Sequence, residues 1–294
     1  MIEYEKSDRE GKIRLDIEDK KTFSVNGIKI KKLSEILGNI YIVLFNPNDI
    51  DILKNGPAAR RRFLDIMISQ LKVKYVYNMN EYVKTLDQRN TYLRQIKYEN
   101  KSEELLDIWD EKLAISGEKI YEYRYEFIEK IKNKINDFHN SITGGKENIE
   151  IKYESMCKSK EEYLKILKKN RSNDILKGYT HAGIHRDDFT IFINGRQVNV
   201  YGSQGQQRTS IISLKLSELE VIYDEIGEYP ILLLDDFMSE LDDKRIQNFL
   251  EKMKNNQVII TCTDKIKIDT NENKFFKIEN GKNLKNTWKE KGLW

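Results

Sequence analysis

Residues 231–242 read ILLLDDFMSELD, and this stretch decides the fold class. Four apolar residues predict a buried strand, and the carboxylates of Asp235 and Asp236 follow where that strand ends. In open α/β sheets, ligands bind at this carboxyl edge. In nucleotide hydrolysis, one acid at such an edge holds Mg²⁺ and a second orients the attacking water. We expect Asp235 to be the metal-side acid and Asp236 the catalytic acid, although two surface aspartates after a strand also fit a purely structural role.

A second motif, YGSQGQQRT at residues 201–209, lies one predicted helix upstream. Free N–H groups and the helix dipole make such a helix mouth an anion site. The order of loop, helix and acidic strand resembles the signature loop and Walker B strand of ABC ATPases, with SELD at their D-loop position. That resemblance implies that the signature loop of one protomer binds the γ-phosphate of ATP held by the other, so hydrolysis requires a dimer. It assigns Ser203, Gln204, Gly205 and Gln206 to the signature loop, and Ser239 and Asp242 to the D-loop.

Two further stretches narrow the resemblance. Residues 44–65 read LFNPNDIDILKNGPAARRRFLD, and residues 183–188 read GIHRDD. With the two motifs above, they resemble the RecF family over essentially the whole chain. Membership would imply a weak DNA-dependent ATPase that forms an ATP-dependent homodimer on DNA, near gaps and junctions between single and double strands. It would also imply work with RecO and RecR to load RecA in recombinational DNA repair, replication-fork maintenance and the SOS response to DNA damage.

The chain departs from these families at two points. No GxxxxGK[ST] phosphate-binding loop occurs in the sequence, because Gly144–Gly145–Lys146 is followed by Glu147 and comes after a predicted helix. We interpret the chain as an N-terminally shortened copy, in which ATP and Mg²⁺ lack part of their site, and we expect no ATP turnover from it alone. The switch histidine of ABC ATPases is also replaced, because Thr263 follows the strand QVIIT.

The remaining pattern predicts an α/β fold: an ABC-type ATPase lobe, with a mixed sheet and flanking helices, into which an α-helical hairpin lobe is inserted. Helical periodicity begins near Arg60, breaks at Tyr98–Ser102 and ends at Gly144–Gly145, so two antiparallel helices of roughly 50–60 Å are expected. The Lys/Glu-rich segment Ile151–Asn173 is typical of a solvated face.

The ATPase lobe would comprise residues 1–59 and 179–294, and the helical lobe residues 60–178. Expected strands and hairpins of the ATPase lobe lie at residues 12–17, 22–31 (turn at Asn26–Gly27), 40–45, 189–200 (turn at Asn194–Gly195), 231–234, 257–261 and 275–282, and expected helices at 209–226 and 244–254.

A basic cluster and a histidine turn are candidates for DNA contact. The paired N–H donors of an arginine guanidinium group suit phosphate oxygens, so Arg60, Arg61 and Arg62 are candidates for contact with DNA. The alternative is that these arginines pair with acids of the neighbouring lobe. His185 and Arg186 are candidates for nucleotide or DNA contact, although a histidine in a turn before a hairpin is often structural.

Composition limits the remaining possibilities. The 294 residues carry 51 basic and 48 acidic side chains, so the net charge of +3 neither demands nor excludes nucleic acid. Neither a run of 18 apolar residues nor a signal peptide is present, and Cys157 and Cys262 match no metal-ligand spacing, so a cytoplasmic protein without membrane contact is expected.

Three alternatives stay open. An SMC- or RecN-like chromosome ATPase would need far longer coiled coils, and the zinc-hook type would need a Cys-x-x-Cys at the hairpin tip. A transporter nucleotide-binding subunit would have a smaller helical insertion. The chain could also be an inactive truncated remnant.

Overall fold

The structure is a computed structural model that describes residues 1–6, 10–17, 21–236, 249, 253–263, 274, 276–279 and 282–284. A central parallel sheet has the order β10-β9-β5, with β5 at Ile42–Phe45, β9 at Ile231–Asp235 and β10 at Val258–Thr261. The register places Phe45 beside Leu234 and Thr261 beside Asp235. The predicted strands at 40–45, 231–234 and 257–261 are therefore confirmed, and segments from both ends of the chain form one sheet. The predicted helix at 244–254 lies almost entirely outside the described residues.

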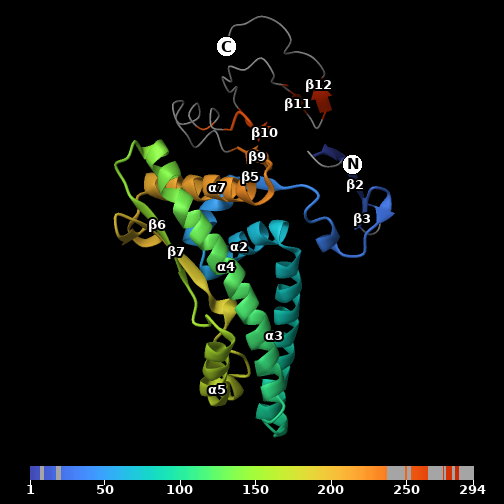
Figure 1. The fold of residues 1–294 in the computed structure, drawn as a ribbon, viewed down its shortest axis with the longest axis vertical. Helices are drawn as coiled ribbons and strands as arrows, with labels where there is room; N and C mark the ends of the chain where they lie inside the picture. Colours follow the sequence, from blue (N-terminus) through green and yellow to red (C-terminus); the bar gives the residue numbers. More distant parts are fainter. Residues whose placement is uncertain are drawn as a thin grey trace, which may run out of the picture.

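Helix α7 (Gln204–Ile226) connects the two main apolar cores. Ile212, Leu216 and Leu219 pack with the central sheet, whereas Ile211, Leu214 and Val221 belong to the core of the helical part. Because both faces of α7 are covered, most of the helix is buried, including several of its polar residues. Figure 1 shows α7 crossing between the central sheet above and the helical part below.

The helical part is an arm of three helices, α2 (Pro57–Leu71), α3 (Val73–Glu99) and α4 (Leu106–Thr143). Helices α3 and α4 run side by side as the predicted hairpin, with a left-handed residue, Asn100, at the tip (Figure 1). At 1.5 Å per residue, α4 spans about 57 Å and α3 about 40 Å. The first helix of the predicted hairpin is divided into α2 and α3, because the backbone is extended at Lys72 (φ −129°, ψ 93°). Helix α3 is therefore shorter than predicted. The apolar period continues through this break, which is why the pattern did not reveal it.

A three-stranded antiparallel sheet of order β6-β7-β8 flanks the arm, with β6 at Ile149–Glu154, β7 at Asp188–Ile193 and β8 at Arg196–Gln197. The hairpin turn at Asn194–Gly195 is confirmed by the positive φ of both residues. Helix α5 (Lys160–Lys177) follows β6 and buries Tyr163, Leu167 and Asp174, so the Lys/Glu-rich segment is solvated on one side only. Strand β6 and its partner β7 lie on opposite sides of the expected lobe boundary at residue 178.

A four-stranded antiparallel sheet, β1 to β4, forms the N-terminal part and contains the predicted turn at Asn26–Gly27. None of the helices in the described part of the chain is long and apolar enough to cross a membrane. The remaining elements are β1 (Ile2–Glu5), β2 (Glu10–Ile17), β3 (Lys21–Val25), β4 (Ile28–Lys29), η1 (Leu33–Glu35), η2 (Pro47–Ile50), α1 (Asp51–Lys54), η3 (Ile184–Arg186), α6 (Val198–Tyr201), β11 (Lys277–Glu279) and β12 (Lys282–Leu284).

Candidate functional site

The carboxyl edge of the central sheet presents two exposed acids. Asp235 is the last residue of β9, and its Oδ1 accepts a hydrogen bond of 2.6 Å from Oγ1 of Thr261 on the neighbouring strand. The second carboxylate oxygen of Asp235 accepts no hydrogen bond from the residues that the structure describes. A carboxylate with one oxygen fixed and one available suits Mg²⁺, which usually takes one or two carboxylates together with water and phosphate.

Asp236 is held in a left-handed backbone conformation, with φ of 48°. Non-glycine residues rarely adopt this region, and such outliers persist where surrounding contacts enforce them, often at functional sites. Here the N–H of Asp236 lies 3.2 Å from both the carbonyl oxygen and Oγ1 of Thr261. Thr261 therefore organises both acids. Thr261 lies outside the acidic motif, and its place at the end of the strand QVIIT is the signal that marks it in the sequence.

The signature mouth, defined as Ser203–Gln206 at the start of α7, is held by a capping box between its first and last residues. Ser203 Oγ accepts from the N–H of Gln206 at 3.2 Å, and Gln206 Oε1 accepts from the N–H of Ser203 at 2.9 Å. First-turn amides have no acceptor within their own helix. Among the described contacts, those of Gln204 and Gly205 have no acceptor elsewhere either, so they are available to an anion.

Gly205 keeps the mouth open. A Cβ placed there would meet nothing closer than Ser203 Oγ, at 3.9 Å, so the packing of this chain does not require glycine at the position. Close approach of a phosphate or of another backbone would require it. Gly202 differs, because a Cβ there would lie 2.6 Å from the carbonyl oxygen of Val198.

The remaining nucleotide residues are only partly described. Thr263, at the switch position, is exposed two residues beyond Thr261. Ser239 and Asp242, assigned to the D-loop, lie outside the described residues. No group of three His, Cys, Asp or Glu side chains able to hold a metal occurs among the described residues.

The arginine cluster divides into buried and exposed members. Arg60 is 8% exposed and forms a bidentate pair with Asp188, at 2.5 and 2.9 Å, which matches the alternative of pairing within the protein. Arg61 donates to the carbonyl oxygen of Asp187 at 2.7 Å. Arg62 is exposed and lines, with Arg61, an open hollow of about 620 Å³ along α2. The other lining residues are Leu37, Ala58, Asp65, Ile66, Ser69 and Gln70.

His185 is engaged within the protein. Its Nδ1 lies 2.8 Å from the hydroxyl of Tyr82 and its Nε2 lies 3.2 Å from the carbonyl oxygen of Thr180. Burial lowers the pKa of His185 to about 4, so the ring is neutral at physiological pH. Neighbouring Arg186 is exposed.

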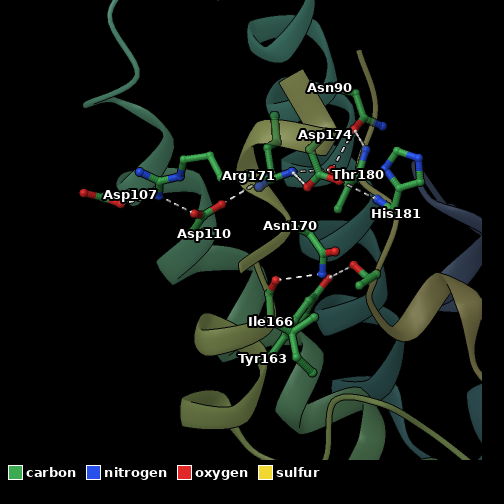
Figure 2. A network of polar contacts seen from close by, with 12 residues as sticks. Asn90, Asp107, Asp110, Tyr163, Ile166, Asn170, Arg171, Asp174, Thr180 and His181 are labelled. Carbon is green, nitrogen blue, oxygen red and sulfur yellow. Dashed lines mark hydrogen bonds and ion pairs between the residues drawn. The ribbon is translucent and has the colours of Figure 1, made fainter. Parts of the chain in front are cut away.

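A buried ion-pair cluster, the arm clasp, lies where helix α5 packs against α3 and α4, and it was not predicted from the sequence. Arg89 on α3 donates to Asp110 on α4 at 2.6 Å, to Asp174 on α5 at 2.8 Å, and to the hydroxyl of Thr180. Arg171 adds a second cation beside Asp110, at 2.7 Å. Figure 2 shows Asp110, Arg171, Asp174, Thr180 and His181 of this cluster, with Asn90 and Asp107 at its margins. The arm clasp joins three helices, but its charges are matched inside the protein.

Comparison with known proteins places this geometry in context. No family model matches the chain. The DNA replication and repair protein RecF of Clostridium perfringens (strain SM101 / Type A) is 44% identical over 270 residues, covering 90% of this chain and 74% of the relative. The RecF proteins of Alkaliphilus oremlandii (strain OhILAs) and Clostridium tetani (strain Massachusetts / E88) are 46% and 42% identical, covering 87% and 97% of this chain and 72% and 80% of the relatives.

Solved structures agree with these relatives. The recombination mediator protein RecF-ATPrS in the RecFOR pathway superposes with a TM-score of 0.85 at 41% identity, over 94% of this chain and 76% of that one. The RecF-ATP structure gives a TM-score of 0.83 at 42% identity, over 88% of this chain and 72% of that one. These matches confirm the predicted α/β fold and the predicted resemblance. The chain belongs to the RecF family of DNA replication and repair proteins.

Proposed function

We propose that this chain is an ATP-dependent DNA-binding protein of recombinational repair, working as a homodimer with a nucleotide site shared between two protomers. The observation that carries the proposal is the acidic edge, where Thr261 fixes Asp235 and holds Asp236 in a left-handed conformation. The printed names of the solved relatives, RecF-ATPrS and RecF-ATP, support ATP as the nucleotide.

Within this site each residue has a distinct role. Asp235 would hold Mg²⁺ through its unengaged oxygen, directly or through water, and Asp236 would orient or polarise the attacking water. Bound Mg-ATP would supply the γ-phosphate. Ser203 and the free amides of Gln204 and Gly205 would contact that phosphate from the second protomer. Thr263 could contribute a hydroxyl, and Ser239 and Asp242 keep the D-loop role that the motif assigns to them.

The sequence contains no phosphate-binding loop, so we expect this chain alone to hydrolyse no ATP. The proposed contact between its signature mouth and ATP is therefore best tested with a second protein that itself binds the nucleotide.

We propose further that the segments 1–59 and 179–294 form the ATPase lobe around a helical lobe of residues 60–178. The parallel pairing of β5 with β9 supports the joining of the two end segments, although the boundary at residue 178 separates the paired strands β6 and β7.

DNA is the proposed macromolecular ligand, with gaps and junctions between single and double strands as the preferred structures. Among the candidate residues, Arg62 and Arg186 are exposed and Arg61 lines the α2 hollow, whereas Arg60 and His185 are engaged within the protein. The relatives from the RecFOR pathway support RecO and RecR as partners, and work on chromosomal DNA would place the chain in the cytoplasm.

The decisive experiment is association with the RecF protein whose ATPrS complex was solved. This chain would be mixed with that protein, with and without Mg-ATPrS, and the mass would be followed by light scattering. We expect a nucleotide-dependent increase in mass for the wild-type chain and none for Ser203→Arg, because a long cation would block the mouth.

Ser172→Arg is the matched control, because Ser172 is an exposed serine on α5, a helix that Figure 1 shows well separated from α7. It should associate as the wild-type chain does. Nucleotide-dependent association of Ser203→Arg at the wild-type level would refute the contact of the signature mouth with the nucleotide.

A further inference from the structure

Both polar atoms of the Gln206 side-chain amide form hydrogen bonds. Its Oε1 accepts from the N–H of Ser203, and its Nε2 donates to Oε1 of Glu147 at 2.8 Å. The other oxygen of Glu147 lies 3.1 Å from Nε2 of His139. Nδ1 of the same ring lies 3.1 Å from Oγ of Ser213, further along α7. A continuous polar chain therefore runs from the last turns of α4 to the signature mouth.

The direction of the hydrogen bonds follows from the ionisation of the histidine. His139 has no exposed surface, and its burial lowers the pKa of the ring, which favours the neutral imidazole near pH 7. The one ring N–H then lies on Nε2, because the Glu147 carboxylate can only accept. Glu147 thus accepts one hydrogen bond from His139 and one from Gln206.

This arrangement selects one orientation of the Gln206 amide. A glutamine amide can rotate by 180°, which exchanges its oxygen and nitrogen. The rotated amide would place its oxygen against the Glu147 carboxylate and its NH₂ group against the N–H of Ser203. Both contacts would be unfavourable, and the capping box would be lost.

We propose that Glu147 and His139 are positioning residues of the signature mouth. They fix the Gln206 amide, and through it the Ser203 cap, in the orientation in which the mouth meets a phosphate group. The functional part of this inference rests on the proposed function, whereas the positioning itself does not. Because His139 lies on α4 and Glu147 three residues beyond its C-cap at Gly144, the position of the arm is coupled to the mouth.

The first test measures the mouth without nucleotide, by hydrogen exchange of a peptide covering residues 200–208. Removing the acceptor in Glu147→Ala should speed exchange of the Ser203 and Gln206 amides about tenfold, as expected for loss of a hydrogen bond to a charged group. Glu150→Ala is the matched control, because Glu150 is exposed on β6 and has no described contact with α7. It should exchange as the wild-type chain does.

A charge swap separates positioning from general damage to the fold. Gln206→Glu alone places two carboxylates together and should speed exchange. Combined with Glu147→Gln, it restores both hydrogen bonds: the new amide donates to Glu at 206 and its oxygen accepts from His139. We expect the double variant to return to within about twofold of the wild-type rate, as a coupled pair should. Wild-type exchange in Glu147→Ala, or a double variant no slower than Gln206→Glu, would overturn the proposal.

The second test asks whether positioning matters for function. Mg-ATPrS-dependent association with the solved RecF protein should weaken about tenfold in Glu147→Ala and remain unchanged in Glu150→Ala. Wild-type association of Glu147→Ala would also overturn the proposal. If the wild-type chain itself does not associate, the shared nucleotide site is wrong, and the exchange experiment still decides whether Glu147 positions the mouth.

Discussion

The acidic edge and the arm clasp are both built from carboxylates, but they use them in opposite ways. At the edge, Asp235 and Asp236 are exposed, and Asp235 has an oxygen without a described partner. In the arm clasp, Asp110 and Asp174 have no exposed surface and are matched by arginines at 2.6 to 2.8 Å. Among these carboxylates, an oxygen without a partner marks the group available to a ligand, and a buried, fully paired carboxylate holds the fold.

If the arm clasp holds the fold, removing its central cation should be strongly destabilising. Arg89→Met would leave Asp110 and Asp174 buried with too little positive charge, which costs about 3–5 kcal/mol in comparable cases. We expect a loss of that size in the free energy of unfolding, measured with urea. Arg94→Ala, an exposed arginine on the same helix, should change it by less than about 0.5 kcal/mol. Equal losses in both variants would show that the clasp is not a special source of stability.

His185 makes the free energy of unfolding depend on pH. The unfolded chain takes up a proton at this ring below about pH 6.5, whereas the folded chain does so only near pH 4. His185 therefore reduces stability as the pH falls through this window. Asp187 acts in the opposite direction, because burial raises its folded pKa to about 6, so it takes up a proton in the folded state first.

The variant His185→Gln isolates the histidine contribution. Relative to wild type, it should gain up to about 2 kcal/mol between pH 7.5 and pH 5, measured by urea unfolding at each pH. Asp187 is present in both proteins, so its contribution largely cancels in the difference. A difference in stability that does not change with pH would mean that His185 is not held neutral by the fold.

Substitutions at Asp236 test its left-handed backbone conformation. Asp236→Ala should lower stability by about 1 kcal/mol, because alanine in the left-handed region is strained. Asp236→Gly should instead leave stability unchanged or raise it by about 0.5 kcal/mol, since glycine adopts this conformation without strain. Thermal unfolding of the two variants makes the comparison. A glycine variant less stable than the alanine variant would show that the left-handed backbone at Asp236 is not strained.

The edge and the mouth could be predicted from the sequence because their signals are local. The apolar run before Asp235 indicates a strand end, and Ser203 with Gln206 three residues later is the pattern of a capping box. The Asn194–Gly195 dipeptide likewise encodes its own turn.

The contacts between distant segments could not be predicted in this way. Arg89 and Asp174 are 85 residues apart, and Gln206 meets Glu147 across 59 residues. Only the folded arm brings these residues together. Thr261 is intermediate, because its strand was predicted but its partner on β9 depends on the register.

Helix α7 has a consequence for how the protein comes apart. Because this helix contributes side chains to both cores, neither the sheet nor the arm can lose its structure while the other keeps a complete apolar interior. The two regions should therefore melt as one cooperative unit rather than as independent modules. A protease acting on native protein would then find few partly opened forms to cut, and quality control in the cell would meet an all-or-none substrate.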